Sequence, residues 1–226
     1  MFPIGDERIR GAETPWVTIS FILINVAVFV YELTLGLPEL EAFYLRWGVV
    51  PAEIMAGNQL ITLITAQFIH GGWLHLIGNM LFLWVFGDNI EVVLGHIGYL
   101  LFYLVGGAIA SMGHVLVNSS STTPSVGASG AIAAILGAYI LMFPQARVRV
   151  LLFLGFFITT TRVTALIFLG LWAFIQLFNG VASLGAPTAQ TAGVAYWAHI
   201  GGFVTGVVVG LIFKGRAARL RIDRGY

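Results

Sequence analysis

Four side chains in this sequence have the types and spacing that hydrolytic chemistry requires. Ser129 stands within Gly127–Gly130, where a polar loop runs into an apolar segment, and His199 follows 70 residues later. His75 and Asn79, four positions apart, form a second polar pair in another apolar run. A serine hydroxyl becomes a nucleophile when a neighbouring base takes its proton, and the oxyanion that follows needs hydrogen-bond donors. These residues therefore favour serine hydrolysis, provided that the fold brings them together.

Each of these residues also has an ordinary structural explanation. A lone serine between glycines in a membrane helix commonly serves close helix packing. A single buried histidine, or Asn79 alone, commonly makes a hydrogen bond between helices. It is the joint pattern that favours catalysis over packing.

No metal site and no cofactor are expected. The chain contains no cysteine, which excludes disulfides, thiolate metal ligands and thiol catalysis. Its other histidines form no His-x₃-His pattern with nearby carboxylates. His70 is expected to face away from His75 and to hold the loop before the next helix. His96 and His114 are expected near the ends of one helix, at the membrane interface.

The composition is that of a polytopic membrane protein. Hydrophobic residues make up 58% of the 226 residues and charged residues 9%, whereas a soluble domain carries about 25% charged residues. Several apolar runs reach the roughly 20 residues that cross a bilayer. The first of them is too long for the apolar region of a signal peptide, and no cleavage site follows it.

The predicted fold is all-α, with a six-helix membrane domain at residues 16–213, after a leader at 1–15 and before a basic tail at 214–226. The expected spans are Trp16–Gly36, Trp73–Gly87, His96–Val117, Ser129–Phe143, Val163–Asn179 and Val194–Phe213. Short interfacial helices are expected within Leu37–Thr65. An acidic turn capped by Asp88 and Glu91 is expected after the second span, and an interfacial segment at Val150–Ile158.

The basic residues predict the orientation of these spans. Six spans put both termini on one side, and 10 of the 11 lysines and arginines then fall on that side, with Arg46 alone on the other. Cytoplasmic loops carry the excess of basic residues in membrane proteins. Both termini are therefore predicted to be cytoplasmic.

This orientation places the polar residues at similar depths. Ser129 and His199 each lie 15 residues from the inner end of their helices, or about 22 Å, and His75 lies about 20 Å from its own. The hydrocarbon core is about 30 Å thick, so all three are expected several ångströms below the outer surface. Glycines at every fourth position across Gly202–Gly210 would let two helices approach closely enough for a serine to reach an imidazole.

Four segments carry a resemblance to a known family: PIGDE at Pro3–Glu7, HGGWLHLIGNMLFLWVFGDNIE at His70–Glu91, GASG at Gly127–Gly130 and AHIGGFVTG at Ala198–Gly206. On these motifs the chain resembles, over nearly its full length, the rhomboid intramembrane serine proteases of the six-helix bacterial and archaeal type. The resemblance implies a helical bundle with a water-filled cavity open to the outside. It also implies a serine endopeptidase that cleaves transmembrane helices of other proteins.

The resemblance implies a role for each residue of the site. Ser129 would be the nucleophile and His199 the general base, forming a dyad without a third acidic residue. The side chains of His75 and Asn79, with the backbone N–H groups of Ser129 and Ala128, would stabilise the oxyanion.

The resemblance also implies a lateral gate and a cap, formed by the Val163–Asn179 helix and the loop Val181–Ala192. Three positions depart from the family pattern. Ile61–Thr62 replaces a frequent Trp–Arg pair, and Gly78 stands where a bulky gate residue can occur. Ala133 replaces an aromatic residue that often stacks on the histidine, so the sequence leaves open what orients that ring.

The expected partners are transmembrane-helix substrates and the lipid bilayer, without nucleic acid; the sequence leaves the oligomeric state open. The expected location is a prokaryotic plasma membrane. A catalytically inactive rhomboid-like protein that binds membrane clients is the alternative function, but it would be expected to lack the serine or the histidine. A transporter or channel would be expected to show inverted repeats or broken helices with charges at the midplane, and none is evident.

Overall fold

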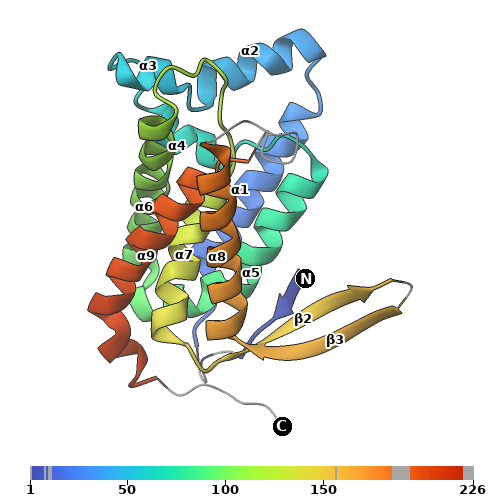
Figure 1. The fold of residues 1–226 in the computed structure, drawn as a ribbon, viewed down its shortest axis with the longest axis vertical. Coiled ribbons are helices and arrows are strands. Elements are labelled where there is room, and N and C mark those ends of the chain that lie inside the picture. Colours follow the sequence, from blue (N-terminus) through green and yellow to red (C-terminus); the bar gives the residue numbers. More distant parts are fainter. Residues whose placement is uncertain (1, 8, 10–11, 156, 185–193, 221–226) are drawn as a thin grey trace.

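The computed structural model describes residues 2–7, 9, 12–155, 157–184 and 194–220. Six helices run between the two ends of the molecule (Figure 1): α1 (Trp16–Glu32), α5 (Trp73–Leu94), α6 (His96–Val117), α7 (Ser129–Met142), α8 (Ala165–Ser183) and α9 (Tyr196–Ala217). All residues of α7 except Ser129 and Leu141 are buried. Helix α7 is therefore the centre of the bundle, and the other helices supply its surroundings.

The lengths and compositions of these helices fit an integral membrane protein. Among the described residues, α5, α6, α8 and α9 are each long and apolar enough to cross a membrane, while α1 and α7 are shorter apolar helices. These six helices correspond to the six predicted spans, and four of them begin at the predicted residue. That all six cross the bilayer stays a prediction.

The predicted acidic turn is wrong, because α5 continues through it. Gly87 does not end the helix; a Cβ there would lie 2.6 Å from the hydroxyl oxygen of Tyr99, so this glycine serves close packing. The helix ends instead before Gly95, whose φ of 75° favours glycine. Asp88 and Glu91 consequently lie inside α5.

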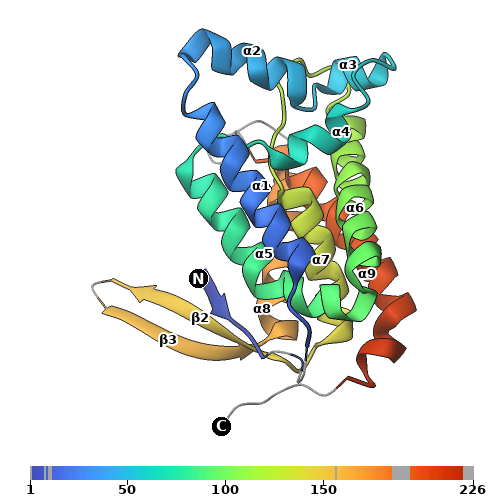
Figure 2. The ribbon, with the colours of Figure 1, turned by 180° about the vertical axis from the view of Figure 1, so that it is seen from behind.

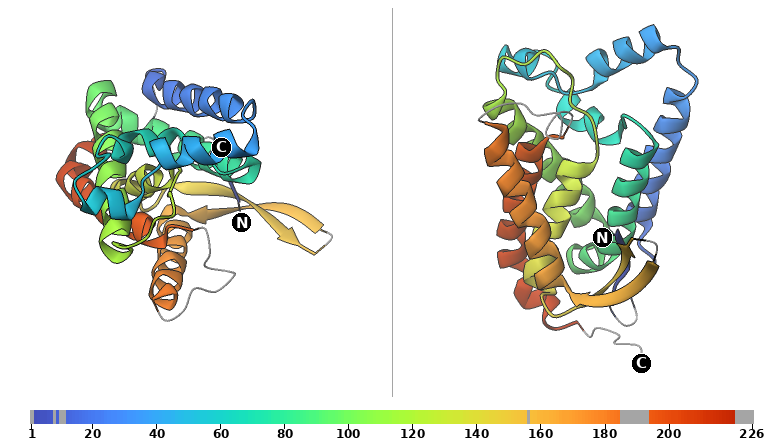
Figure 3. Two further views of the ribbon diagram at one scale, coloured as in Figure 1. Left: turned by 90° about the horizontal axis from the view of Figure 1, so that it is seen from above. Right: turned by 45° about the vertical axis from the view of Figure 1, so that its right-hand side comes forward.

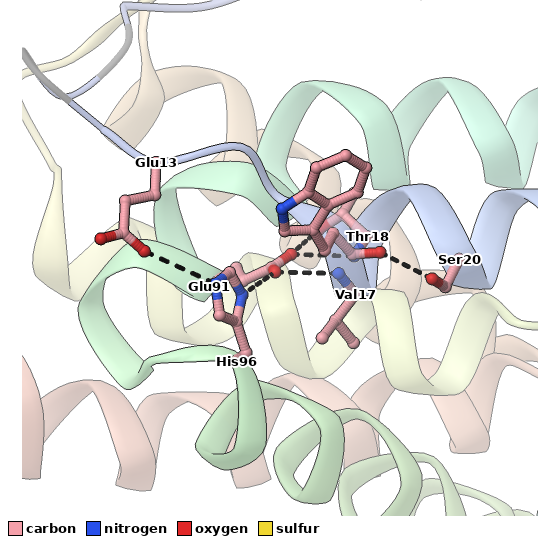
Figure 4. Close-up of polar contacts among 7 residues, drawn as sticks. Glu13, Val17, Thr18, Ser20, Glu91 and His96 are labelled. Carbon is pink, nitrogen blue, oxygen red and sulfur yellow. Dashed lines mark hydrogen bonds and ion pairs between the residues drawn. The ribbon is translucent and has the colours of Figure 1, made fainter.

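Glu91 is a structural cap, but of α1 rather than of a turn (Figure 4). Its carboxylate accepts hydrogen bonds from the backbone N–H groups of Val17 at 2.9 Å and Thr18 at 2.8 Å, and from the Thr18 hydroxyl at 2.7 Å. His96 Nδ1 lies 2.6 Å from the same carboxylate, and its Nε2 lies 3.7 Å from Glu13. A negative charge at a helix N-terminus is stabilising, so Glu91 ties α1 to α5 and α6.

The chain is not all-α, because it contains a three-stranded antiparallel sheet in the order β1 (Phe2–Gly5), β2 (Arg147–Leu154) and β3 (Phe157–Thr164). Strands β2 and β3 pair from Arg147↔Thr164 to Leu154↔Phe157. The segment predicted to lie along the interface, Val150–Ile158, is therefore part of a β-hairpin, and Val163 belongs to β3 rather than to the following helix.

The pattern of β2 explains the sheet. Val148 and Val150 are buried whereas Arg147 and Arg149 are exposed, and this period of two is that of a strand with one covered face. The sequence of β3, FITTTRVT, is rich in β-branched residues, which favour strands. The apolar character of the segment hid this alternation.

The N-terminal motif ties the sheet to the bundle. Asp6 accepts hydrogen bonds from Asn89 Nδ2 at 2.8 Å and from the Tyr139 hydroxyl at 2.5 Å. Glu7 accepts one from the backbone N–H of Arg147 at 3.1 Å. The leader therefore joins α5, α7 and β2 at the end of the bundle that carries the sheet.

The opposite end is covered by short helices: α2 (Leu37–Trp47), α3 (Pro51–Met55), α4 (Thr62–Thr65) and the 3₁₀ helix η1 (Ala66–Phe68) (Figure 2). The predicted short helices in this connection are thus confirmed. Two backbone hydrogen bonds join Val49 to Ser125, at 2.8 and 2.9 Å. They fix the loop that leads into α7.

Helices α7 and α9 are in backbone contact. A Cβ on Gly206 would collide with the carbonyl oxygen of Ala134, and one on Gly202 would collide with that of Gly130. The predicted glycine series of α9 thus faces α7, and only glycine permits this separation.

Three further predictions are not tested, or are tested only in part, by the described residues. Helix α8 ends at Ser183, and most of the predicted cap, Val181–Ala192, lies outside the described residues. The same holds for residues 221–226 of the basic tail. The boundaries of the leader, membrane domain and tail stay predictions.

Candidate active site

Three helices begin at the same end of the bundle and bring their first turns together. Ser129 is the first residue of α7, His199 lies in the first turn of α9, and His75 in the first turn of α5. The first hydrogen bond of α7 runs from the Ile132 N–H to the Ala128 carbonyl. The N–H groups of Ala128 and Ser129 therefore have no acceptor within the helix, and the helix dipole is positive there.

Ser129 and His199 are in hydrogen-bond contact. His199 Nε2 lies 2.8 Å from Ser129 Oγ, and both side chains are half-buried. The structure thus brings together the predicted serine and histidine across the backbone contact of α7 and α9.

Gly127 shapes the turn in front of the serine. Its φ of 131° lies in the region that favours glycine, and its N–H donates to the Ala66 carbonyl at 2.9 Å. A Cβ at this position would also lie 2.7 Å from His75 Nε2. A glycine is therefore required here for two separate reasons.

His75 and Asn79 lie on the neighbouring helix. His75 Nε2 approaches Gly127, two residues before Ser129, while its Nδ1 accepts a long hydrogen bond from the Gly71 N–H at 3.4 Å. Asn79 follows one turn deeper in α5 and is 8% exposed. Within the described part of the chain its Nδ2 has no hydrogen-bond partner, so this donor is uncommitted.

His70 does not face away from His75, contrary to expectation. The two rings lie 5.0 Å apart in an edge-to-face arrangement. Helical spacing fails here because α5 begins after a turn at Gly72, with φ 155°. The expected role in the loop is supported: the His70 N–H donates to Glu32 at 3.1 Å, and its carbonyl accepts from Tyr44 at 3.3 Å.

Burial keeps the His70 ring neutral. The ring is fully buried, and this burial, together with the nearby His75, lowers the pKa of His70 to about 3. An uncharged His70 adds no positive charge next to His75 at neutral pH.

Two side chains of α8 contact His199, and neither is among the predicted site residues. Gln176 Oε1 lies 2.8 Å from His199 Nδ1. The Trp172 ring, one turn earlier on α8, lies 5.9 Å from the imidazole between centroids, and the Tyr196 ring of α9 lies 6.4 Å away. Gln176 could have been selected from the sequence, because a glutamine in an apolar span is energetically costly unless it is paired.

A small cavity lies beside Ser129 on the side of α6. It has a volume of about 20 Å³ and is lined by residues that include Gln67, Ser111 and Gly130. That volume suits one water molecule, and Ser111 and Gln67 provide polar partners. Among the described residues no group of three or more His, Asp or Glu side chains is arranged to hold a metal ion.

His96 and His114 lie at opposite ends of α6, as expected. His96 is the first residue of that helix, and His114 lies in its last turn, with its Nδ1 3.3 Å from Asn118 Nδ2. Their position relative to a membrane interface stays a prediction.

Comparisons with known proteins identify the family of this chain. The family model described as "Rhomboid domain" matches residues 57–216, more than half of the chain. RHOMBOID-like protein 4 of Arabidopsis thaliana is 28% identical over 92% of this chain and 56% of its own length. Rhomboid protein 1, mitochondrial, of Saccharomyces cerevisiae is 29% identical over 83% of this chain and 50% of its own.

A relative whose name states an activity is Rhomboid protease GluP of Bacillus subtilis. It is 27% identical over 89% of this chain and 41% of its own length. The chain spans about half the length of the curated relatives that it matches. The match over the membrane domain shows that this chain belongs to the rhomboid family.

Proposed function

We propose that this protein is an intramembrane serine endopeptidase, with Ser129 as nucleophile and His199 as general base. The observation that carries the proposal is the 2.8 Å contact between His199 Nε2 and Ser129 Oγ. A serine paired with a histidine inside an apolar bundle has little structural reason to be there, because polar groups at that depth are costly. The family, which includes a named protease, supports the same reading.

The reaction follows from these contacts. Ser129 Oγ attacks the carbonyl carbon of the scissile peptide bond while its proton passes to His199 Nε2. The tetrahedral intermediate collapses as His199 returns that proton to the leaving amide nitrogen, which breaks the C–N bond and leaves an acyl-enzyme. A water molecule, deprotonated by His199 in the same way, then hydrolyses the ester.

The oxyanion would be stabilised by donors from two helices. His75 accepts at Nδ1 from Gly71, so its ring proton sits on Nε2, which faces the turn before Ser129. The uncommitted Nδ2 of Asn79 and the N–H groups of Ser129 and Ala128 complete the set. Donors that the fold holds in fixed positions are effective because they need no reorganisation during the reaction.

A substrate helix would enter between α5 and α8. Towards the end of the bundle that carries the sheet, this seam is closed by aromatic packing, because the Phe168 ring lies 6.3 Å from both Phe82 and Phe86. One turn towards the site, a Cβ on Gly78 would meet no atom within 4 Å. The seam therefore has open space beside Gly78, next to Asn79.

The substrate class follows from the location. A transmembrane helix hides its carbonyls in internal hydrogen bonds, so the segment must unwind before Ser129 can attack it. Substrates with small or helix-weakening residues near the cut are therefore expected. Cytoplasmic termini and a prokaryotic plasma membrane remain part of this proposal.

The deciding experiment uses purified full-length protein and a transmembrane test substrate. Ser129→Ala and His199→Ala should each lower kcat/KM by about 10³-fold or more without changing the thermal unfolding temperature. A serine-reactive phosphonate should label the wild type and Ser120→Ala, whose serine is exposed in the preceding loop, but not Ser129→Ala. Unchanged cleavage by Ser129→Ala would leave the inactive, client-binding alternative as the better description.

A further inference from the structure

The two ring nitrogens of His199 have different partners on different helices. Nε2 lies 2.8 Å from Ser129 Oγ on α7, and Nδ1 lies 2.8 Å from Gln176 Oε1 on α8. An amide oxygen is an acceptor only, so the ring proton sits on Nδ1. Nε2 is then left with a lone pair directed at the serine hydroxyl.

We infer that Gln176 is a positioning residue, which holds His199 in the tautomer that can accept the proton of Ser129. This inference rests on the proposed function. A neutral imidazole exists in two tautomers, and only the one protonated at Nδ1 can act as a base through Nε2. Without an acceptor at Nδ1, the ring can instead place its proton on Nε2, where it would donate to Ser129 Oγ.

Gln176 also explains how the His199 ring is held, although α7 provides no aromatic residue beside it. Position 133 is an alanine, so helix α7 supplies no ring to cover His199. Trp172 and Gln176 lie four residues apart, on one face of α8, and both contact His199. The imidazole is thus hydrogen-bonded to Gln176 through Nδ1 and lies beside the tilted ring of Trp172.

Gln176 and Trp172 belong to α8, a helix with few buried residues. The buried residues of α8 are Ala165, Phe168 and Leu169 near its start and Gly180 near its end. Gly180 lies against α9, since a Cβ there would be 2.8 Å from Ile200 Cδ1 and 3.5 Å from Tyr196 Cβ. Between these anchors, Trp172 and Gln176 reach His199, and Trp172 also lies 6.1 Å from the Phe203 ring of α9. The tautomer of the base is therefore conditional on α8 lying against α9.

The alternative is that the hydrogen bond between Gln176 and His199 is purely structural. Its loss would then lower stability and would not alter the tautomer of His199. His75 of α5 and His114 of α6 are the other titratable groups whose charge acts on His199, and both are unchanged in the variants below.

The test compares Gln176→Met, which keeps the length of the side chain without an acceptor, with Gln176→Glu, which keeps the acceptor. Leu177→Met, at an exposed position of the same helix, is the matched control. Gln176→Met should lower kcat by roughly 10- to 100-fold with an unchanged KM, since general-base catalysis contributes about 10²–10⁴-fold. Gln176→Glu should restore most of kcat and move the acidic limb of the pH profile of kcat upwards, because a carboxylate stabilises the imidazolium. Leu177→Met should match the wild type.

A readout that does not need activity is the tautomer itself. In ¹⁵N-histidine protein, the His199 signals, assigned with His199→Gln, should show a proton on Nδ1 in the wild type and a loss of that preference in Gln176→Met. Unchanged signals, or a fall in kcat that only follows a lower unfolding temperature, would overturn the inference. If the wild type shows no Ser129-dependent cleavage, the proposed function fails, and the tautomer measurement still decides what Gln176 does.

Discussion

The contact of α7 with α9 and the contact of α8 with α9 hold the same histidine in different ways. At the first, Gly202 and Gly206 bring two backbones together, so the separation of Ser129 from His199 is fixed by main-chain packing. At the second, side chains of α8 reach His199, and seen from above α8 stands at the periphery of the bundle (Figure 3). The distance between Ser129 and His199 is thus set by a rigid contact, and the orientation of the His199 ring by a peripheral helix.

The largest effect is expected from breaking the rigid contact. Gly206→Leu places a side chain where the Ala134 carbonyl lies, and backbone atoms cannot move aside as a flexible side chain can. Overpacking of this kind should cost about 3 kcal/mol of unfolding free energy. Cleavage should fall by about 100-fold or more, since misplacement by about 1 Å is enough for such a loss. Chemical unfolding in detergent and kcat/KM on the test substrate measure both.

The matched control is Gly215→Leu, at the other end of α9. A Cβ at Gly215 would meet no atom within 4 Å, so this variant should keep both stability and activity. If Gly206→Leu were fully active, the α7–α9 contact would not fix the distance between Ser129 and His199.

A smaller effect is expected from loosening the peripheral contact. Gly180→Leu would push α8 away from α9, because Ile200 Cδ1 lies 2.8 Å from the position of a Cβ. Since Ile200 presents the end of a flexible side chain, the fold should persist. With Gln176 moved from Nδ1 of His199, kcat should fall roughly 10-fold, a fraction of what general-base catalysis contributes.

Two comparisons sharpen this second prediction. Gly170→Leu, on the same helix where a Cβ would meet no atom within 4 Å, should leave kcat unchanged. The double variant Gly180→Leu/Gln176→Met should be little worse than Gln176→Met alone, because both changes remove one interaction. Additive losses would mean that the two residues act separately.

The difference between the α7–α9 contact and the α8–α9 contact also explains which features the sequence could predict. The serine and the histidine were found because helix lengths, charge distribution and a glycine series act over many residues and survive small errors in boundaries. The starts of α5, α6 and α7 followed from strong local signals. Helix ends are encoded more weakly: glycine is a residue that often ends a helix, but Gly87 is a packing position against Tyr99.

Other features depend on contacts that local patterns do not encode. The hairpin of β2 and β3 is stabilised by pairing with β1 from the distant leader, and its apolar residues resembled a membrane segment. The approach of His70 to His75 depends on a turn at Gly72 that no helical spacing describes. Gln176 carried a usable signal, a polar side chain in an apolar span, but its partner was fixed only once α8 was placed beside α9.

The smallest effect is expected where α5 and α8 separate near the site. Gly78 precedes Phe82 by one turn, and Phe82 already packs against Phe168. In Gly78→Phe a further ring would extend that packing outwards, and opening the seam would cost about 0.7 kcal/mol more. The kcat/KM for the transmembrane substrate should fall roughly 3-fold, whereas labelling of Ser129 by a water-soluble phosphonate should keep its rate. Ile77→Phe, at an exposed neighbouring position, should change neither rate. An equal fall in cleavage and labelling after Gly78→Phe would show that the added ring disturbs Ser129 and His199. Unchanged cleavage would show that substrates do not enter between these two helices.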